Sequence, residues 1–349
     1  MTPLSPRASV AIAWLRLVFV AQVMFGHLAL IALPRFTALD LHRPADLAVA
    51  GYRLVTRFGP QAAYAFVFLS GWFLVPQLVA LAQSGGSVRP FLVRRVGRLY
   101  PTLVAALTLT LACDLVGTRV LGATALYRTT FNYDAVAALN TTALLGNLVS
   151  LEPTFASAFG SNGPLWTLGY LVQFYILGAA VAASVARAPV TAAALTATVS
   201  VAALLWRPEW LLLALTWAGA GAVRMLPAPA RRVAMLLGAA GVILFVAANR
   251  LPTLPSIATV AVATAALVAA SRSLQGPAVL PRWTDAGTRA SLAIYAFHMP
   301  LAMMTYAAFD AAGLLTLPGA RPAFIVTAAL LAVGLALAWE RLTAGSPAR

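Results

Sequence analysis

Two residues of the first hydrophobic stretch, Arg16 and His27, have side chains suited to anion binding and proton transfer. They lie eleven positions apart. A continuous helix would therefore present both within about 20° of one face and about 16 Å apart. Ionisable residues are costly in lipid and usually have a function there. A membrane histidine can instead bond a neighbouring helix, and Arg16 can extend to the headgroups, so the spacing alone leaves these alternatives open.

A cluster of arginines, Arg94, Arg95 and Arg98, precedes the third hydrophobic stretch. Arg94 and Arg98 are four positions apart and share a helix face, which gives a cationic fork suited to a polyphosphate. The alternative is a topology determinant that contacts anionic lipid, and taken alone the cluster favours this alternative.

The segment 162–175 begins with Asn162 and continues with Trp166, Tyr170 and Gln173 at helical spacing. Aromatic residues are common at the membrane interface. The polar row at this spacing instead predicts a face directed into a helix bundle.

A second polar row occurs near the C-terminus, where Ser291, Tyr295 and His298 stand at positions i, i+4 and i+7 of one predicted helix. Pro300 follows and is expected to free backbone carbonyls beside His298. Considered in isolation, this histidine is as compatible with a structural hydrogen bond as with a catalytic role.

The elements that must position these residues are membrane helices. Of 349 residues, 61% are hydrophobic and only 9% are charged, far below the roughly 25% of soluble domains. We expect an all-α integral membrane protein, a single domain over 1–349 without a fused soluble domain. About ten transmembrane helices in one bundle are predicted at 10–33, 60–82, 99–121, 165–186, 188–206, 208–226, 233–249, 255–271, 289–313 and 321–340.

The run 135–151 is interrupted by Asn140, Gly146 and Asn147, which predicts a re-entrant or interfacial segment rather than a span.

The net charge of +15 comes from 24 basic residues, all of them arginine, dispersed between apolar runs. This dispersal favours membrane orientation over nucleic-acid binding. With both termini in the cytoplasm, the inner loops hold fourteen arginines and the outer loops nine, as the positive-inside rule requires. The lack of lysine suggests GC-rich coding, so we expect a bacterial cell (inner or plasma) membrane. A single cysteine and three histidines spread over 272 positions predict no metal site.

Taken together, these residues resemble acyltransferase family 3, a family of membrane O-acyltransferases, over nearly the whole chain. The family's signature of an arginine and a histidine separated by ten residues is similar to Arg16 and His27. The other resembling motifs are, in chain order, the aromatic segment 66–72 with Ser70-Gly71, the arginines Arg94, Arg95 and Arg98 before Pro101, Trp166-Thr167-Leu168 with Phe174-Tyr175, Ser291 with Tyr295 and His298, and Trp339-Glu340-Arg341.

The resemblance implies transfer of an acyl group, most often acetyl from acetyl-CoA, to a hydroxyl of a glycan, a lipid-linked sugar or a glycosylated metabolite. Acyl-CoA would be a co-substrate, and no bound cofactor is expected. Membrane lipid would surround the protein. In this hypothesis Arg94, Arg95 and Arg98 bind the CoA phosphates and Arg16 helps to place the donor. His27 acts as general base or carries the acyl group as an intermediate. The residues expected to polarise the carbonyl or position the acceptor are His298, Tyr295, Ser291, Trp166, Asn162, Tyr175 and Ser70.

One departure from the family pattern bears on activity. Family members commonly carry a glutamate three residues after the leucine of the Trp-Ser-Leu motif, and this chain has Leu171 there. This departure motivates one alternative, a weakened family member that acts as a partner subunit. A separate alternative is a transporter or flippase of a glycan or anionic lipid, in which Arg16, His27 and His298 would line the pathway.

Overall fold

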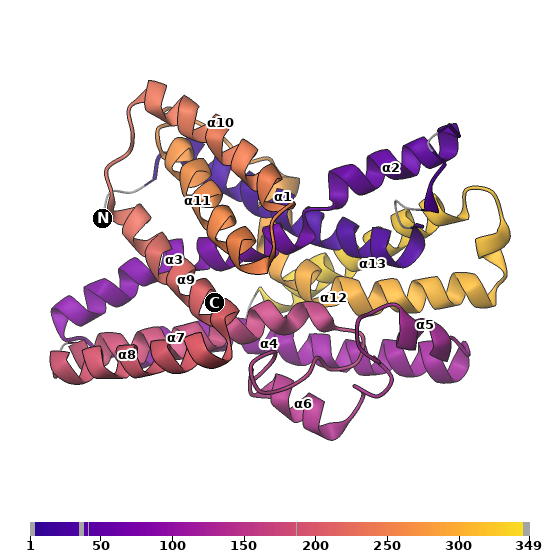
Figure 1. The fold of residues 1–349 in the computed structure, drawn as a ribbon, viewed down its shortest axis with the longest axis horizontal. Coiled ribbons are helices and arrows are strands. Elements are labelled where there is room, and N and C mark those ends of the chain that lie inside the picture. Colours follow the sequence, from indigo (N-terminus) through magenta and orange to yellow (C-terminus); the bar gives the residue numbers. More distant parts are fainter. Residues whose placement is uncertain (1–3, 35–37, 41, 186, 345–349) are drawn as a thin grey trace.

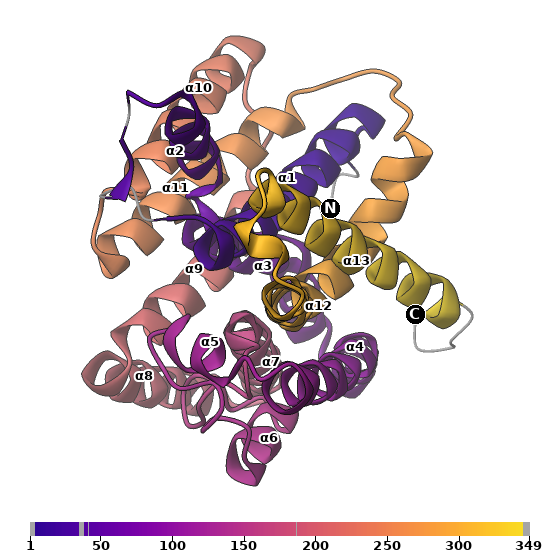
Figure 2. The same cartoon turned by 90° about the vertical axis from the view of Figure 1, so that its right-hand side faces the viewer.

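The computed structural model of the chain is built from helices. It describes residues 4–34, 38–40, 42–185 and 187–344, and no strand occurs in these ranges. Several long helices, among them α3, α4, α8 and α12, run along the long axis in Figure 1 and are seen more nearly end-on in Figure 2. The long helices are α1 (Pro6–Ala32), α3 (Gly59–Ser84), α4 (Arg89–Leu115), α7 (Trp166–Val185), α8 (Pro189–Trp206), α9 (Pro208–Met225), α10 (Arg231–Ala248), α11 (Thr253–Arg272), α12 (Arg282–Ala311) and α13 (Ala320–Thr343).

Shorter elements connect these helices. They are α2 (Pro44–Thr56), the π-helical turn η2 (Val116–Val120) that continues α4, α5 (Thr124–Thr129), α6 (Thr141–Leu148), and the 3-10 turns η3 (Gly163–Leu165) and η4 (Leu314–Thr316). Local chemistry accounts for several boundaries. The Ser5 side chain accepts a hydrogen bond from the Ala8 amide at the start of α1, and α3 ends at Gly85 with φ of 65°.

Nine helical spans of the described residues are long and apolar enough to cross a membrane. They correspond to nine of the ten predicted stretches and confirm an all-α multi-pass membrane protein. The remaining stretch, 208–226, forms α9, whose first turn contains Glu209 and whose last turn contains Arg224. These two charges lower its hydropathy, yet α9 packs against α3, α7, α8 and α11 within the bundle.

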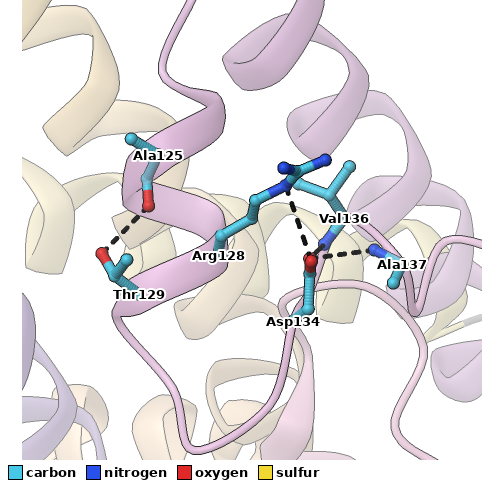
Figure 3. A network of polar contacts seen from close by, with 6 residues as sticks. All are labelled: Ala125, Arg128, Thr129, Asp134, Val136 and Ala137. Atoms are coloured by element: carbon cyan, nitrogen blue, oxygen red, sulfur yellow. Dashed lines mark hydrogen bonds and ion pairs between the residues drawn. The ribbon is translucent and has the colours of Figure 1, made fainter.

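Among the described residues, the segment between α4 and α7 contains no helix long enough to cross a membrane apart from the η2 continuation of α4. Within the run 135–151 only the eight residues of α6 are α-helical, too short for a span of about 20 residues. This confirms the prediction that the run is not a full span. Asp134 shapes the loop ahead of α6, as Figure 3 shows: its carboxylate accepts hydrogen bonds from the amides of Val136 and Ala137 and lies 3.5 Å from Arg128 Nε.

The core is centred on α12, which packs against α1, α4 and α13 and continues through Pro300 to Ala311. A second close contact joins α3 and α9. A Cβ on Gly71 would stand 1.9 Å from the carbonyl oxygen of Trp217, so the Ser-Gly pair of α3 permits backbone contact that any larger residue would prevent.

Candidate active site

A first cavity, of about 390 Å³, lies between α1, α3, α4, α7 and α12. We call it the arginine cavity because Arg16, Arg95 and Arg98 line it. The other predicted site residues in its wall are Ser70, Tyr175, Ser291 and Tyr295. Arg94 is exposed and does not line this cavity. The pair that faces the cavity is therefore Arg95 and Arg98, three positions apart, rather than the Arg94 and Arg98 pair expected from helical spacing.

The positive charges of this cavity have no carboxylate partner within the described part of the chain. Arg16 Nη2 donates to Ser291 Oγ at 3.0 Å, and Ser291 in turn donates to the Thr288 carbonyl at 2.8 Å. Arg95 Nη2 donates to Gln77 Oε1 at 3.0 Å, while its Nε is buried without a partner. In the described ranges no aspartate or glutamate forms an ion pair with any of the three arginines. Arg16 and Arg95 are half-buried and Arg98 is exposed, and three cations without counter-ions among the described residues make this cavity suited to an anionic ligand.

A pair of hydroxyl groups, from Ser70 and Tyr175, also lines the arginine cavity. Ser70 Oγ and Tyr175 Oη lie 3.0 Å apart, and Trp217 Nε1 donates to Ser70 Oγ at 3.3 Å. The tryptophan bond fixes the serine hydroxyl between α3, α7 and α9. Both predicted residues are therefore held in place by hydrogen bonds at this wall.

A second cavity, of about 970 Å³, contains His27. Its wall is formed by the segments 131–133, 152–158 and 163–166 together with residues 206 and 207, so we call it the loop cavity. Trp166 also lines it. The two cavities share no lining residue. Arg16 and His27 thus belong to one helix and to different cavities.

His298 is buried and lies against His27. His298 Nδ1 is 2.8 Å from the carbonyl oxygen of Tyr295 and 3.2 Å from that of Ile294. Because carbonyls only accept, Nδ1 of a neutral His298 carries the proton and Nε2 has the lone pair. His298 Nε2 is 2.8 Å from His27 Nδ1, so His27 donates there. The Nε2 atom of His27 is left with a free lone pair, as a proton acceptor requires.

A thin layer separates the two cavities. Tyr295, which lines the arginine cavity, donates through its hydroxyl to the carbonyl oxygen of Pro164, which lines the loop cavity, at 2.8 Å. Asn162 holds the adjoining turn, since its Nδ2 donates to Thr110 Oγ1 and to the Ala296 carbonyl, both at 2.9 Å. Thr167 continues the layer on the arginine side.

Sequence reasoning missed Glu152 and Tyr133, two residues of the loop cavity. Glu152 is 3% exposed, and burial raises its pKa well above the ordinary value of 4.5. Burial also raises the pKa of Tyr133, whose hydroxyl donates to the Gly160 carbonyl. Neither residue belongs to a helical pattern, so only their polar character in an apolar chain could have indicated them. In the described part of the chain no group of three or more His, Cys, Asp or Glu residues could hold a metal ion.

Comparison with known proteins assigns the chain to a family. A family model described as an acyltransferase domain, that of acyltransferase family 3, matches residues 9–339. No curated protein and no solved structure matches the chain. The matched range includes every residue placed above in the two cavities. The chain therefore belongs to acyltransferase family 3 and is a multi-pass membrane enzyme that transfers acyl groups other than amino-acyl groups.

Proposed function

We propose that this enzyme transfers an acetyl group from acetyl-CoA to a hydroxyl of a glycan, a lipid-linked sugar or a glycosylated metabolite. The observation that carries the donor assignment is the arginine cavity, where three arginines have no carboxylate partner in the described residues. Acetyl-CoA is anionic through its phosphates and ends in a thioester on a long, neutral arm. A cavity lined by both cations and neutral hydroxyl groups suits such a molecule.

Each arginine has a distinct place in this proposal. Arg95 and Arg98 bind the phosphates with their planar guanidinium groups. Arg94, which is exposed outside the cavity, attracts the anionic donor from solution. Arg16 lies on α1 against Ser291 of α12 and holds the pyrophosphate or the pantetheine arm, so that the thioester points toward Tyr295 and the thin layer.

His27 is the general base of the proposed reaction. Its Nε2 removes the proton of the acceptor hydroxyl while the hydroxyl oxygen attacks the thioester carbonyl. The tetrahedral intermediate then breaks its carbon–sulfur bond. CoA leaves as a thiolate, which takes the proton from the imidazolium, and the ester product remains. Attack by Nε2 itself, giving an acyl-histidine, is the second route that the same lone pair permits.

His298 positions His27 in this proposal, because its backbone-anchored ring fixes the proton of His27 on Nδ1. Tyr295 and Asn162 hold the thin layer across which the thioester carbonyl and the acceptor must meet. Trp166, on the loop-cavity side, forms part of the acceptor wall. Ser70 and Tyr175 border the donor arm in the arginine cavity.

We further place the enzyme in the bacterial cell membrane with both termini in the cytoplasm. The arginine cavity then opens toward the cytoplasm, where acetyl-CoA is made, and the loop cavity opens outward. The inner excess of arginine supports this orientation.

The test is transfer of radiolabel from [¹⁴C]acetyl-CoA by the purified protein in nanodiscs to candidate glycans and glycosylated lipids. We expect a labelled ester that depends on both donor and acceptor, and a loss of at least 10² in turnover for His27→Ala at unchanged protein level. Movement of a glycan or anionic lipid across proteoliposomes without acylation would instead identify a transporter. Absence of both activities would favour a partner subunit.

A further inference from the structure

The loop cavity combines aromatic rings with one buried acid. Phe155 and Trp206 have ring centroids 4.8 Å apart, and Phe131 and Tyr133 are stacked at 5.2 Å. All four residues line the cavity together with Trp166. Flat aromatic faces pack well against the apolar faces of sugar rings, whereas a few polar groups fix the orientation of such a ligand.

Glu152 of this wall has a buried carboxyl oxygen without a hydrogen-bond partner among the described residues. It is 3% exposed, and its Oε2 atom has no hydrogen-bond partner among the described residues. A buried, unpaired carboxyl destabilises a protein, and natural structures retain few of them. A lipid tail in the cavity would leave the carboxyl unpaired, whereas a hydroxyl-bearing ligand would satisfy it.

The backbone around Glu152 is fastened to α7. Gln173 Nε2 donates to the Ser150 carbonyl at 2.8 Å, and Gln173 Oε1 accepts from Thr154 Oγ1 at 3.0 Å, so both flanks of the glutamate are anchored. A Cβ on Gly169 would stand 1.9 Å from the Glu152 carbonyl oxygen. The fold therefore holds this unsatisfied acid firmly in the cavity wall.

We propose that the loop cavity binds a neutral pyranose unit of the acceptor and that Glu152 is the residue that hydrogen-bonds its hydroxyl groups. This inference rests on the proposed function, since it places the acceptor in the same cavity as His27. The raised pKa of Glu152 supports it: a protonated carboxyl both donates and accepts hydrogen bonds, which matches a sugar hydroxyl. A further hydroxyl of the bound ring is then presented to Nε2 of His27.

The experiment measures sugar binding separately from acetyl transfer. Wild-type protein in nanodiscs, free of maltoside detergent because that detergent is itself a glycoside, is titrated with methyl α-glucopyranoside, methyl α-mannopyranoside and methyl α-galactopyranoside. Saturation-transfer NMR gives the Kd of each. The variants are Glu152→Leu and Glu152→Gln. Asp310→Asn is the matched control, because Asp310 is an exposed acid of α12 that does not line the cavity.

We expect at least one of these glycosides to bind, with Kd raised about two- to tenfold for each neutral hydrogen bond that Glu152→Leu removes. Glu152→Gln is expected to raise Kd less, and Asp310→Asn to leave it unchanged. In the transfer assay the acceptor KM rises with Glu152→Leu while the KM for acetyl-CoA stays constant. The unfolding temperature of Glu152→Leu equals or exceeds that of wild type, because an unpaired buried polar group has been removed.

Three results would overturn the inference: no binding of any glycoside to wild type, unchanged binding in Glu152→Leu, or a Glu152→Leu protein with a lowered unfolding temperature, which indicates a structural role. A leucine variant that does not fold counts as the third of these results, and Glu152→Gln then supplies the binding measurement. Glycoside binding that needs Glu152 but is never followed by acetyl transfer refutes the proposed function and leaves the sugar site standing.

Discussion

Substitution of His298 by alanine tests how His27 is activated. The variant removes the nitrogen, 2.8 Å away, that accepts the Nδ1 proton of His27. A neutral hydrogen bond contributes about 0.5–1.5 kcal/mol net, and its loss also allows the proton to move to Nε2, where the ring no longer accepts a proton. We expect kcat to fall about two- to tenfold, against at least 10² for His27→Ala.

The assay is initial-rate acetyl transfer in nanodiscs for wild type, His298→Ala, His27→Ala and the double variant. Because His298 acts through His27, the double variant should be no slower than His27→Ala alone. His42→Ala is the matched control, since His42 is an exposed histidine outside both cavities. Losses that multiply in the double variant, or a His298→Ala effect confined to the acceptor KM, would refute this reasoning.

Three further predictions follow from the two cavities. Arg16→Ala should raise the KM for acetyl-CoA about ten- to a hundredfold with little change in kcat, whereas the reverse pattern would remove Arg16 from donor binding. Tyr295→Phe keeps the ring but loses the bond to the Pro164 carbonyl, so acetyl-CoA hydrolysis without acceptor should rise about two- to tenfold; a decrease would point to Tyr295 as the group that polarises the carbonyl. The pKa of Glu152 is raised in the folded protein, so the folded protein holds this proton more tightly than the unfolded protein does. The free energy of unfolding should therefore decline by up to about 1.4 kcal/mol per pH unit as the pH rises above about 4.5. Unfolding curves of wild type and Glu152→Gln between pH 4 and pH 8 measure this, and equal slopes would contradict it.

Hydropathy predicted the long helices well, because the length and apolar composition of a single helix are nearly sufficient to place it in a bilayer. The exceptions have physical reasons. α2 was not predicted, since its 13 residues are too short for a span. It depends instead on Arg53, whose guanidinium donates to the carbonyl oxygens of Ala29 and Leu33 at the end of α1. Such a tertiary contact leaves no periodic signal in the sequence.

The sequence patterns selected candidate side chains, several of which line the two cavities, but they did not predict how these side chains are grouped. Helical spacing placed Arg16 and His27 on one helix, but only the neighbouring helices decide that they line different cavities. The same holds for the arginine cluster, where packing turns Arg95 inward and leaves Arg94 exposed.

The structure shows where the chain has Leu171 in place of the glutamate that is common in the family. Leu171 lies in the wall of the arginine cavity. A carboxylate at this place would have been in the wall of the same cavity as Arg16, Arg95 and Arg98, where it would offset part of the positive charge that the proposed donor site requires. The sequence could show that the acid was missing but not which groups it would have faced.

In the proposed mechanism the donor lies in the arginine cavity and the acceptor lies in the loop cavity beside His27. A cryo-EM map of the protein in nanodiscs with CoA tests this most directly. We predict phosphate density beside Arg95 and Arg98 and the thiol end directed toward Tyr295. CoA density in the loop cavity, or phosphates remote from both arginines, would contradict the account.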